Sequence, residues 1–325
     1  MLSKKKKPKS QSKSKKRTEK SVFSYLQTGD VIDIVAPGSP CSKEVFEHAV
    51  AWIKAQGYIP RYPQDMLAPE IFISNTDEKR LQFLVEALKN KESKAVWCLR
   101  GGYGAIRLVP QLLKIKKLPQ KKLFIGYSDV TTIHLWLNQK MKWPTVHGPL
   151  LDRCGQNQLS ENNKNELLSV LSGQKKEVYF SDLKPVNSAA KKHKTKLKAQ
   201  LYGGNLTVVC SSLGTELQPA FKNHFLFFED IGERGYRIDR MLNQLEQAGL
   251  FKSCKAVFLG DFILGQETNG DNHVWTVLQN FFEKLKCPVY SGVQSGHGEQ
   301  QRPLILNGSA TLTCDNSVRL LTSFE

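Results

Sequence analysis

The apolar residues in the first half of the chain follow two alternating spacings. Short apolar runs of four to six residues are typical of buried strands, and longer segments with a period near 3.6 are typical of amphipathic helices. The apolar runs are residues 31–36, 95–99 and 123–126, and the helical segments are residues 43–56 and 77–90. In the second helical segment Leu81, Leu84 and Leu88 share one face. This alternation predicts a parallel, doubly wound sheet whose functional loops follow the carboxyl ends of its strands.

The pattern changes after the first 150 residues. Residues 172–199 contain several basic runs and little periodicity, which predicts a linker or an exposed crossing, and a helix follows at residues 238–248 among short strands. A chain of 325 residues is also longer than one typical domain. We therefore expect four parts, which are a basic tail at 1–22, an α/β domain at 23–150, a connecting segment and linker at 151–199, and a second domain at 200–325.

The positive charge is concentrated at the N-terminus. Residues 1–20 hold ten Lys or Arg and one Glu, which accounts for +9 of the total charge of +17. With almost no large hydrophobic residue, this stretch is expected to stay disordered, and it could tether the protein weakly to RNA or to an anionic surface. No apolar run is long enough for a signal peptide or a membrane span, so we expect no membrane insertion.

The seven cysteines give no sign of a disulfide framework or a metal site. No two of them have the C-x-x-C spacing, and several stand inside apolar runs, as Cys98 and Cys210 do. A buried, reduced thiol behaves as a small hydrophobic side chain, so a reducing cytoplasm fits best. We expect neither a metal nor an organic cofactor.

The segment 124–129 carries the first candidate chemistry. A short apolar strand runs into Gly126 and places Ser128 on a sharp turn before a helix at residues 130–138. At such an elbow a serine can act as a nucleophile while the backbone N–H groups that follow it stabilise an oxyanion. A serine in this position can also be a helix N-cap and nothing more, because Ser is a favoured cap.

Three other segments supply what a nucleophilic serine needs. The glycine-rich turn at 100–104 offers backbone N–H groups, Glu229 and Asp230 follow a buried-looking strand, and His297 stands between glycines. The order of serine, acid and histidine is that of the α/β-hydrolase triad, although the order varies between folds. The turn at 100–104 is not a dinucleotide fingerprint, because Arg107 stands where that motif needs a small residue.

Two other histidines are weaker candidates for the base. His134 lies six residues after Ser128 on the following helix, which turns its side chain to another face. His147 precedes a Gly-Pro pair and is expected to help form a turn.

In these motifs and their order the chain resembles the LD-carboxypeptidase family of serine peptidases, which includes the microcin C immunity peptidases. The matching segments are residues 34–40, 100–105, 126–129, 147–149, 203–206, 228–231, 236–240 and 295–298. The resemblance implies an N-terminal Rossmann-like α/β domain, a smaller β-rich C-terminal domain and an active site between them. It implies Ser128 as the nucleophile, Glu229 as the acid and His297 as the base. It also implies the backbone N–H groups of Gly102 and Asp129 as the oxyanion hole.

The resemblance further implies a substrate and a set of contacts. The substrate would be a muropeptide tetrapeptide, cut between the L-centre of its diamino acid and the terminal D-alanine. The reaction would serve cell-wall recycling in the cytoplasm, and the enzyme would be a homodimer. Tyr103 and Arg237 are possible substrate contacts. Two alternatives remain open, a peptidase of the same family acting on toxic aminoacyl-nucleotides, and a non-catalytic RNA-binding or scaffold protein on this fold.

Overall fold

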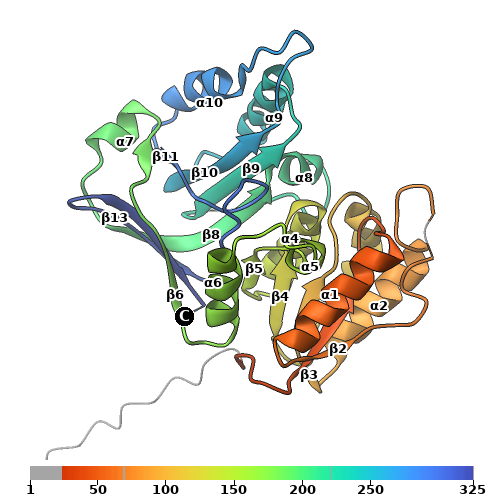
Figure 1. The fold of residues 1–325 in the computed structure, drawn as a ribbon. Coiled ribbons are helices and arrows are strands. Elements are labelled where there is room, and N and C mark those ends of the chain that lie inside the picture. The colour runs from red at the N-terminus through yellow and green to blue at the C-terminus, as the bar shows by residue number, and fades with distance from the viewer. Residues whose placement is uncertain (1–23, 69, 221, 325) are drawn as a thin grey trace, which may run out of the picture.

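The computed structural model describes residues 24–68, 70–220 and 222–324, so the predicted basic tail lies outside the described residues. In this part of the chain two sheets lie side by side, each covered by helices (Figure 1). None of the described helices is both long and apolar enough to cross a membrane.

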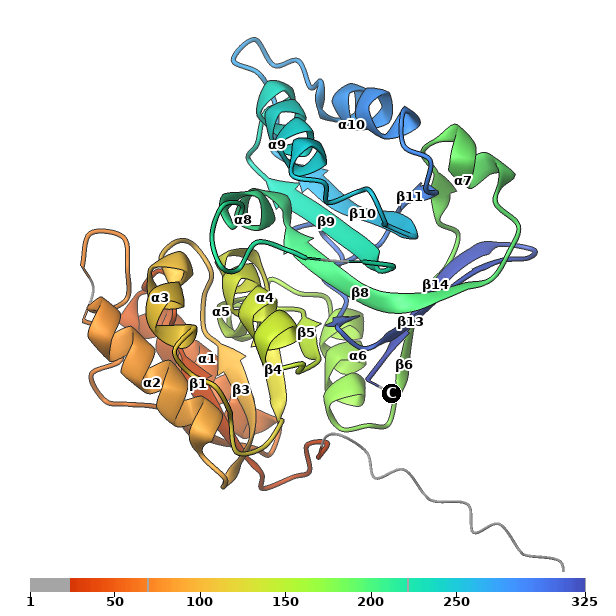
Figure 2. The same ribbon diagram turned by 180° about the vertical axis from the view of Figure 1, so that it is seen from behind.

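The first sheet has the order β12-β5-β4-β3-β1-β2, and its strands β1 to β5 are parallel. Helices α1 and α5 pack together on one face, and α2, α3 and α4 lie on the other (Figures 1 and 2). The strands are β1 (Val31–Val35), β2 (Ile59–Arg61), β3 (Ser93–Cys98), β4 (Leu123–Gly126), β5 (Thr145–His147) and β12 (Leu304–Leu306). The helices are α1 (Lys43–Ala55), α2 (Asp77–Lys89), η1 (Ala105–Leu108), α3 (Val109–Leu112), η2 (Ser128–Val130), α4 (Thr131–Lys140), α5 (Leu151–Gly155) and α6 (Glu161–Leu171).

The second sheet is mixed, with the order β6-β14-β13-β8-β9-β10-β11-β7. The long strand β8 joins its two parts, since residues 197–200 pair antiparallel with β13 and residues 201–205 pair parallel with β9 (Figure 2). The strands are β6 (Glu177–Phe180), β7 (Lys184–Pro185), β8 (Leu197–Asn205), β9 (Phe225–Ile231), β10 (Ala256–Ile263), β11 (Val289–Ser291), β13 (Ser309–Cys314) and β14 (Val318–Ser323). The helices are α7 (Ser188–Lys192), α8 (Leu206–Ser211), α9 (Gly235–Gln247) and α10 (Val274–Glu283).

The α/β fold with a parallel first sheet and a β-rich second half is therefore confirmed. Two details differ from the sequence prediction. Residues 172–199 are not a simple linker, because they form β6, β7, α7 and the start of β8. In addition, β12 from the C-terminal half adds antiparallel to β5 at the edge of the first sheet.

Two apolar cores hold this arrangement. The larger core includes the first sheet and also residues of the second sheet, such as Leu201 and Phe227, which are fully buried. The smaller core lies between the second sheet and helices α8 to α10, around Leu226 and Phe228. Because neighbouring residues on β9 point to opposite faces, Phe227 and Phe228 enter different cores. The two halves are therefore joined by a shared apolar core.

Candidate active site

The position of the site follows from the order of the strands in the first sheet. The sheet contains the order β2-β1-β3-β4-β5. The chain goes from β1 to β2 on one side of β1 and then crosses over to β3 on the other side, so the direction of winding reverses between β1 and β3. Ligands of open α/β sheets bind beside the carboxyl ends of the strands at such a switch point. The loops after β1, β3 and β4 reach this point, and they carry Ser39, Gly101–Gly102 and Ser128.

Ser128 stands on a strained elbow. It follows β4, opens η2 and has a φ of 65°, a backbone conformation that non-glycine residues seldom adopt. Such strain costs about 1–3 kcal/mol and persists where the surrounding structure enforces it, often at functional sites. Asp129 lies in the first turn of η2, whose N–H groups have no acceptor within the helix.

The glycine-rich turn after β3 lies directly against this elbow. A Cβ atom on Gly101 would stand 2.8 Å from the Cβ of Ser128, so any larger residue would displace the serine. Gly102 has a φ of +86°, and its Cβ would collide with the side chain of Ser39. Ser39 fixes the turn by donating its N–H to Gly101 O at 2.8 Å and by accepting the Tyr103 N–H at 3.0 Å. Gly101 therefore lies against the Ser128 elbow, and Gly102 lines the same cavity as Ser128.

A carboxylate of the second sheet orients the candidate histidine. Glu229 on β9 is completely buried, and its Oε2 lies 2.7 Å from Nδ1 of His297. The N–H of His297 reaches the same oxygen at 3.3 Å. Gly296 makes this approach possible, since a Cβ at that position would stand 2.6 Å from Glu229 Oε2. With Nδ1 directed at the carboxylate, Nε2 of the ring is the nitrogen left for chemistry.

The neighbouring carboxylate has a different set of partners. Asp230 accepts hydrogen bonds from Asn205 Nδ2 at 3.0 Å and from the N–H and hydroxyl of Thr207 at 2.9 and 2.8 Å. Burial, and then the charge of Glu229, raise the pKa of Asp230 to about 6. Asn205 also donates its N–H to Thr131 Oγ1 at 3.1 Å, which connects β8 with α4. Asp230 therefore anchors the start of α8 to β9, and only Glu229 of this pair contacts His297.

A cavity of about 300 Å³ brings the separate segments together. Ser128, Gly102 and His297 line it, and so do Arg100 and Arg153. The ring of Tyr127 packs edge-on against the imidazole of His297 at 4.7 Å between centroids, which supports the ring from one side. The sequence alone does not single out the two arginines as substrate contacts, because a single Arg carries no local signal of an anion site, either in a loop as at Arg100 or in a short helix as at Arg153.

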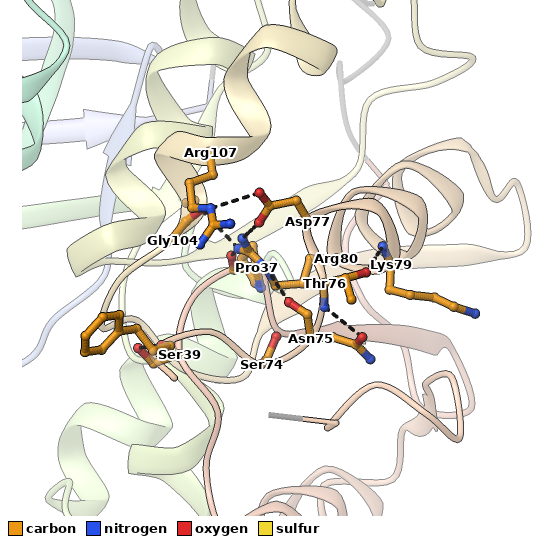
Figure 3. Close-up of polar contacts among 12 residues, drawn as sticks. Pro37, Ser39, Ser74, Asn75, Thr76, Asp77, Lys79, Arg80, Gly104 and Arg107 are labelled. Atoms are coloured by element: carbon orange, nitrogen blue, oxygen red, sulfur yellow. Dashed lines mark hydrogen bonds and ion pairs between the residues drawn. The ribbon is translucent and has the colours of Figure 1, made fainter. Parts of the chain in front are cut away.

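The buried Arg80 of α2 connects the loop after β1, the loop after β3 and the segment just before α2 (Figure 3). Its guanidinium donates to the carbonyl oxygens of Pro37, Asn75 and Gly104, and it forms an ion pair with Asp77 at 2.5 Å. A charge that is buried with this many acceptors holds its surroundings rigidly. The sequence did carry a signal, because Arg80 precedes Leu84 by four residues and therefore falls on the apolar face of the helix.

Asp129 fastens the same turn from the side of the elbow. Its Oδ2 accepts the N–H of Ala105 at 2.9 Å, and its side chain is almost fully buried. Burial raises the pKa of Asp129 to about 6, although the Ala105 N–H and the positive charge of Arg80 favour the ionised form. The side chain of Asp129 is therefore both a buried titratable group and a direct contact of the glycine-rich turn.

The raised pKa of Asp129 predicts a specific dependence of stability on pH. In the unfolded chain an Asp loses its proton near pH 4, whereas folded Asp129 keeps its proton up to about pH 6. The unfolding free energy therefore falls as the pH rises through this window, by about 3 kcal/mol from this residue alone. An amide at this position cannot titrate, so the unfolding free energy of Asp129→Asn relative to wild type should rise by about that amount from pH 4 to pH 7.

Urea unfolding of both proteins at several pH values measures this difference, and titrations common to both proteins cancel in it. Asp65→Asn, an exposed carboxylate outside the cavity, serves as the matched control. A difference between Asp129→Asn and wild type that stays constant with pH would refute the prediction.

The other residues singled out from the sequence lie outside the cavity lining. Tyr103 is half exposed and packs against Phe72, while Arg237 lies on the surface of α9 and pairs with Glu233 at 3.5 Å. His134 is buried on α4 between Thr145 Oγ1 and Gly126 O, each at 2.8 Å, so it does not face Ser128 as a base. His147 was expected in a turn but lies in β5, fully buried against Tyr127 and Phe227.

Within residues 24–68, 70–220 and 222–324, no cluster of three or more His, Cys, Asp or Glu side chains could hold a metal ion. All seven cysteines are free thiols, and Cys98, Cys154 and Cys210 are buried.

Comparison with known proteins gives one consistent result. The model of the LD-carboxypeptidase N-terminal domain matches residues 32–148, and that of the C-terminal domain matches residues 198–312. A protein of Rickettsia conorii is 36% identical over 250 residues, covering 77% of this chain and 78% of that protein. The murein tetrapeptide carboxypeptidase of Pseudomonas aeruginosa is 29% identical over 287 residues, covering 85% of this chain and 92% of the relative.

Solved structures agree with the sequence comparison. The crystal structure of muramoyltetrapeptide carboxypeptidase from Oxalobacter formigenes superposes with a TM-score of 0.78 at 28% identity, covering 90% of this chain and 98% of that one. The two matched domain models, the relatives and this superposition all point to the same group of peptidases. The chain belongs to the LD-carboxypeptidase family.

Proposed function

We propose that this protein is a serine carboxypeptidase that releases the terminal D-alanine from muropeptide tetrapeptides. One observation carries the proposal. The buried carboxylate of Glu229 lies 2.7 Å from Nδ1 of His297, and His297 shares a cavity with the strained elbow of Ser128 and the backbone of Gly102. These are the parts that acyl transfer through a serine requires.

In the proposed mechanism Ser128 Oγ attacks the amide carbonyl while Nε2 of His297 takes its proton. Glu229 holds the ring and stabilises the imidazolium, and the N–H groups of Gly102 and Asp129 bind the oxyanion. The tetrahedral intermediate collapses, the C–N bond breaks, and His297 returns the proton to the leaving amine of D-alanine. Water then attacks the acyl-enzyme with the same base, which frees the tripeptide and restores Ser128.

A carboxypeptidase must also hold the free carboxylate of its substrate. Two arginines line the cavity, Arg100 and Arg153. Arg100 stands 3.9 Å from Asp152 and keeps about half of its side chain exposed, so it is free to turn toward an anion. Arginine binds carboxylates through two parallel hydrogen bonds, which favours these residues for the terminal carboxylate.

The substrate proposal predicts a selective reaction. The purified protein should release D-alanine from a tetrapeptide stem that ends in an L-centre-to-D-alanine bond. It should spare the D-alanyl-D-alanine bond of the matching pentapeptide, because there the residue before the scissile bond has the opposite configuration. Chromatographic detection of free D-alanine from both stems measures the preference.

An aminoacyl sulfamoyl adenylate provides the comparison substrate. Faster hydrolysis of this compound than of the tetrapeptide would assign the same chemistry to aminoacyl-nucleotide detoxification. Equal release of D-alanine from tetrapeptide and pentapeptide would contradict the proposed specificity, and hydrolysis of none of the three would contradict the activity.

A further inference from the structure

A second hollow lies on the outer face of the antiparallel strands β6, β14, β13 and β8. It is a groove of about 860 Å³, and none of its lining residues lines the catalytic cavity. These four strands arch away from the helices α9 and α10 that cover the other end of the sheet (Figure 2). The groove is therefore a separate surface.

The alternation of side chains along the strands makes this face polar. On β13 Ala310 and Leu312 are buried in the core, whereas Thr311 and Thr313 line the groove. On β14 Leu320 is buried while its neighbours line the groove. Because adjacent residues of a strand point to opposite faces, one face closes the core and the other offers hydroxyl and cationic groups.

The charge of the groove is strongly positive. Five cations line it, with Glu177 as the one carboxylate of the lining. The cations are Lys175, Lys176, Lys196, Lys198 and Arg319. Lys175 pairs with Glu166 and Arg319 pairs with Asp315, whereas the other three have no ion pair among the described residues. The hydroxyl of Tyr179 donates a hydrogen bond to the carboxylate of Glu177, the one negative charge of the lining.

We propose that this groove binds single-stranded RNA through its phosphodiester backbone. Lysines and threonine hydroxyls are common donors to phosphate oxygens, and both kinds of side chain line this groove. Tyr179 has 43% of its surface exposed at the groove and offers a face on which a base can stack. A cationic groove with an aromatic platform is the arrangement by which single strands are bound without sequence preference.

The start of the described chain supports a polyanionic occupant. Tyr25 lines the groove, and residues 1–23, which precede it closely in the sequence, contain ten Lys or Arg and one Glu. The groove and this segment carry charge of the same sign, so the occupant that suits both is a polyanion. Around a polyanion, both would contribute to binding.

The shape of the groove favours RNA over an anionic membrane. A bilayer is flat on this scale and reaches protruding side chains, whereas the donors that line this hollow include the short, partly buried side chains of Thr311 and Thr313. A flexible single strand can follow such a surface. The experiment must therefore distinguish RNA binding from binding to an anionic membrane.

The test measures the fluorescence anisotropy of a fluorescein-labelled 20-residue oligouridylate with the full chain at two salt concentrations. The double variant Lys196→Glu with Lys198→Glu should weaken binding at least tenfold. The fall of log K with log salt should also become less steep by about 1.4, the value for two phosphate contacts on a single strand. Tyr179→Ala should weaken it about fivefold or more through lost stacking. D-alanine release should stay unchanged in all of them, because these residues are outside the catalytic cavity.

The matched control is Lys116→Glu with Lys117→Glu, which makes the same change in net charge at two exposed lysines outside the groove. It should change the affinity less than threefold. Equal losses in groove and control variants would overturn the proposal, and so would binding that depends only on Lys4–Lys7 of the tail. Groove-dependent binding to vesicles of phosphatidylserine and phosphatidylcholine, without binding to the oligonucleotide, would assign the groove to a membrane instead.

Discussion

Ser128→Ala should reduce D-alanine release by a factor of about a thousand or more while the protein stays folded. The hydroxyl is the proposed nucleophile, and its loss leaves only binding and oxyanion stabilisation to act on a water molecule. Alanine is smaller than serine, so the close approach of Gly101 creates no clash. Initial rates on the tetrapeptide, together with thermal unfolding, measure the two effects separately.

A double mutant tests whether Ser128 and His297 act as one unit. His297→Ala should cost about as much as Ser128→Ala, and the combined variant should be scarcely slower than either single variant. The base has no task once the nucleophile is absent. Losses that multiply in the double mutant, or normal turnover by Ser128→Ala, would rule out the proposed triad.

The second large effect concerns the choice between two adjacent carboxylates. Glu229→Gln should lower turnover about a thousandfold, because a neutral amide no longer stabilises the imidazolium that forms on His297. Glu229 is fully buried, and its Oε1 has no hydrogen-bond partner in the described structure, so the new amide group would also lack an acceptor there. The loss should fall on the maximal rate rather than on substrate affinity.

The matched control is Asp230→Asn, one residue away and also buried. Its carboxylate accepts three hydrogen bonds from Asn205 and Thr207, so an amide would direct a donor at other donors. The expected result is a loss of about 1–3 kcal/mol in unfolding free energy with turnover within a fewfold of wild type. The opposite pattern, a stable but inactive Asp230→Asn and an active Glu229→Gln, would exchange the two roles.

Arg80 and Ser39 show why a site can be only partly predicted from sequence. Both hold the glycine-rich turn in place, but Arg80 lies outside every matching segment, and the segment 34–40 does not by itself indicate the role of Ser39. Arg80 stands on the apolar face of its helix, which marks it as unusual, but its acceptors Pro37 and Gly104 lie 43 and 24 residues away along the chain. Such contacts depend on how the loops after β1 and β3 meet.

The local sequence by itself determined the alternating strands and helices of the first half, the elbow at Ser128 and the glycines beside His297, since these depend on residues only a few positions apart. The membership of β12 in the first sheet and the partner of each carboxylate were decided only by the tertiary structure. Glu229 and His297 are 68 residues apart, and whether an acid meets a histidine over that separation depends on the packing of whole strands. The cationic groove has the same origin, because its lysines and hydroxyls come from distant strands and from the segments just before them, which the antiparallel pairing brings together.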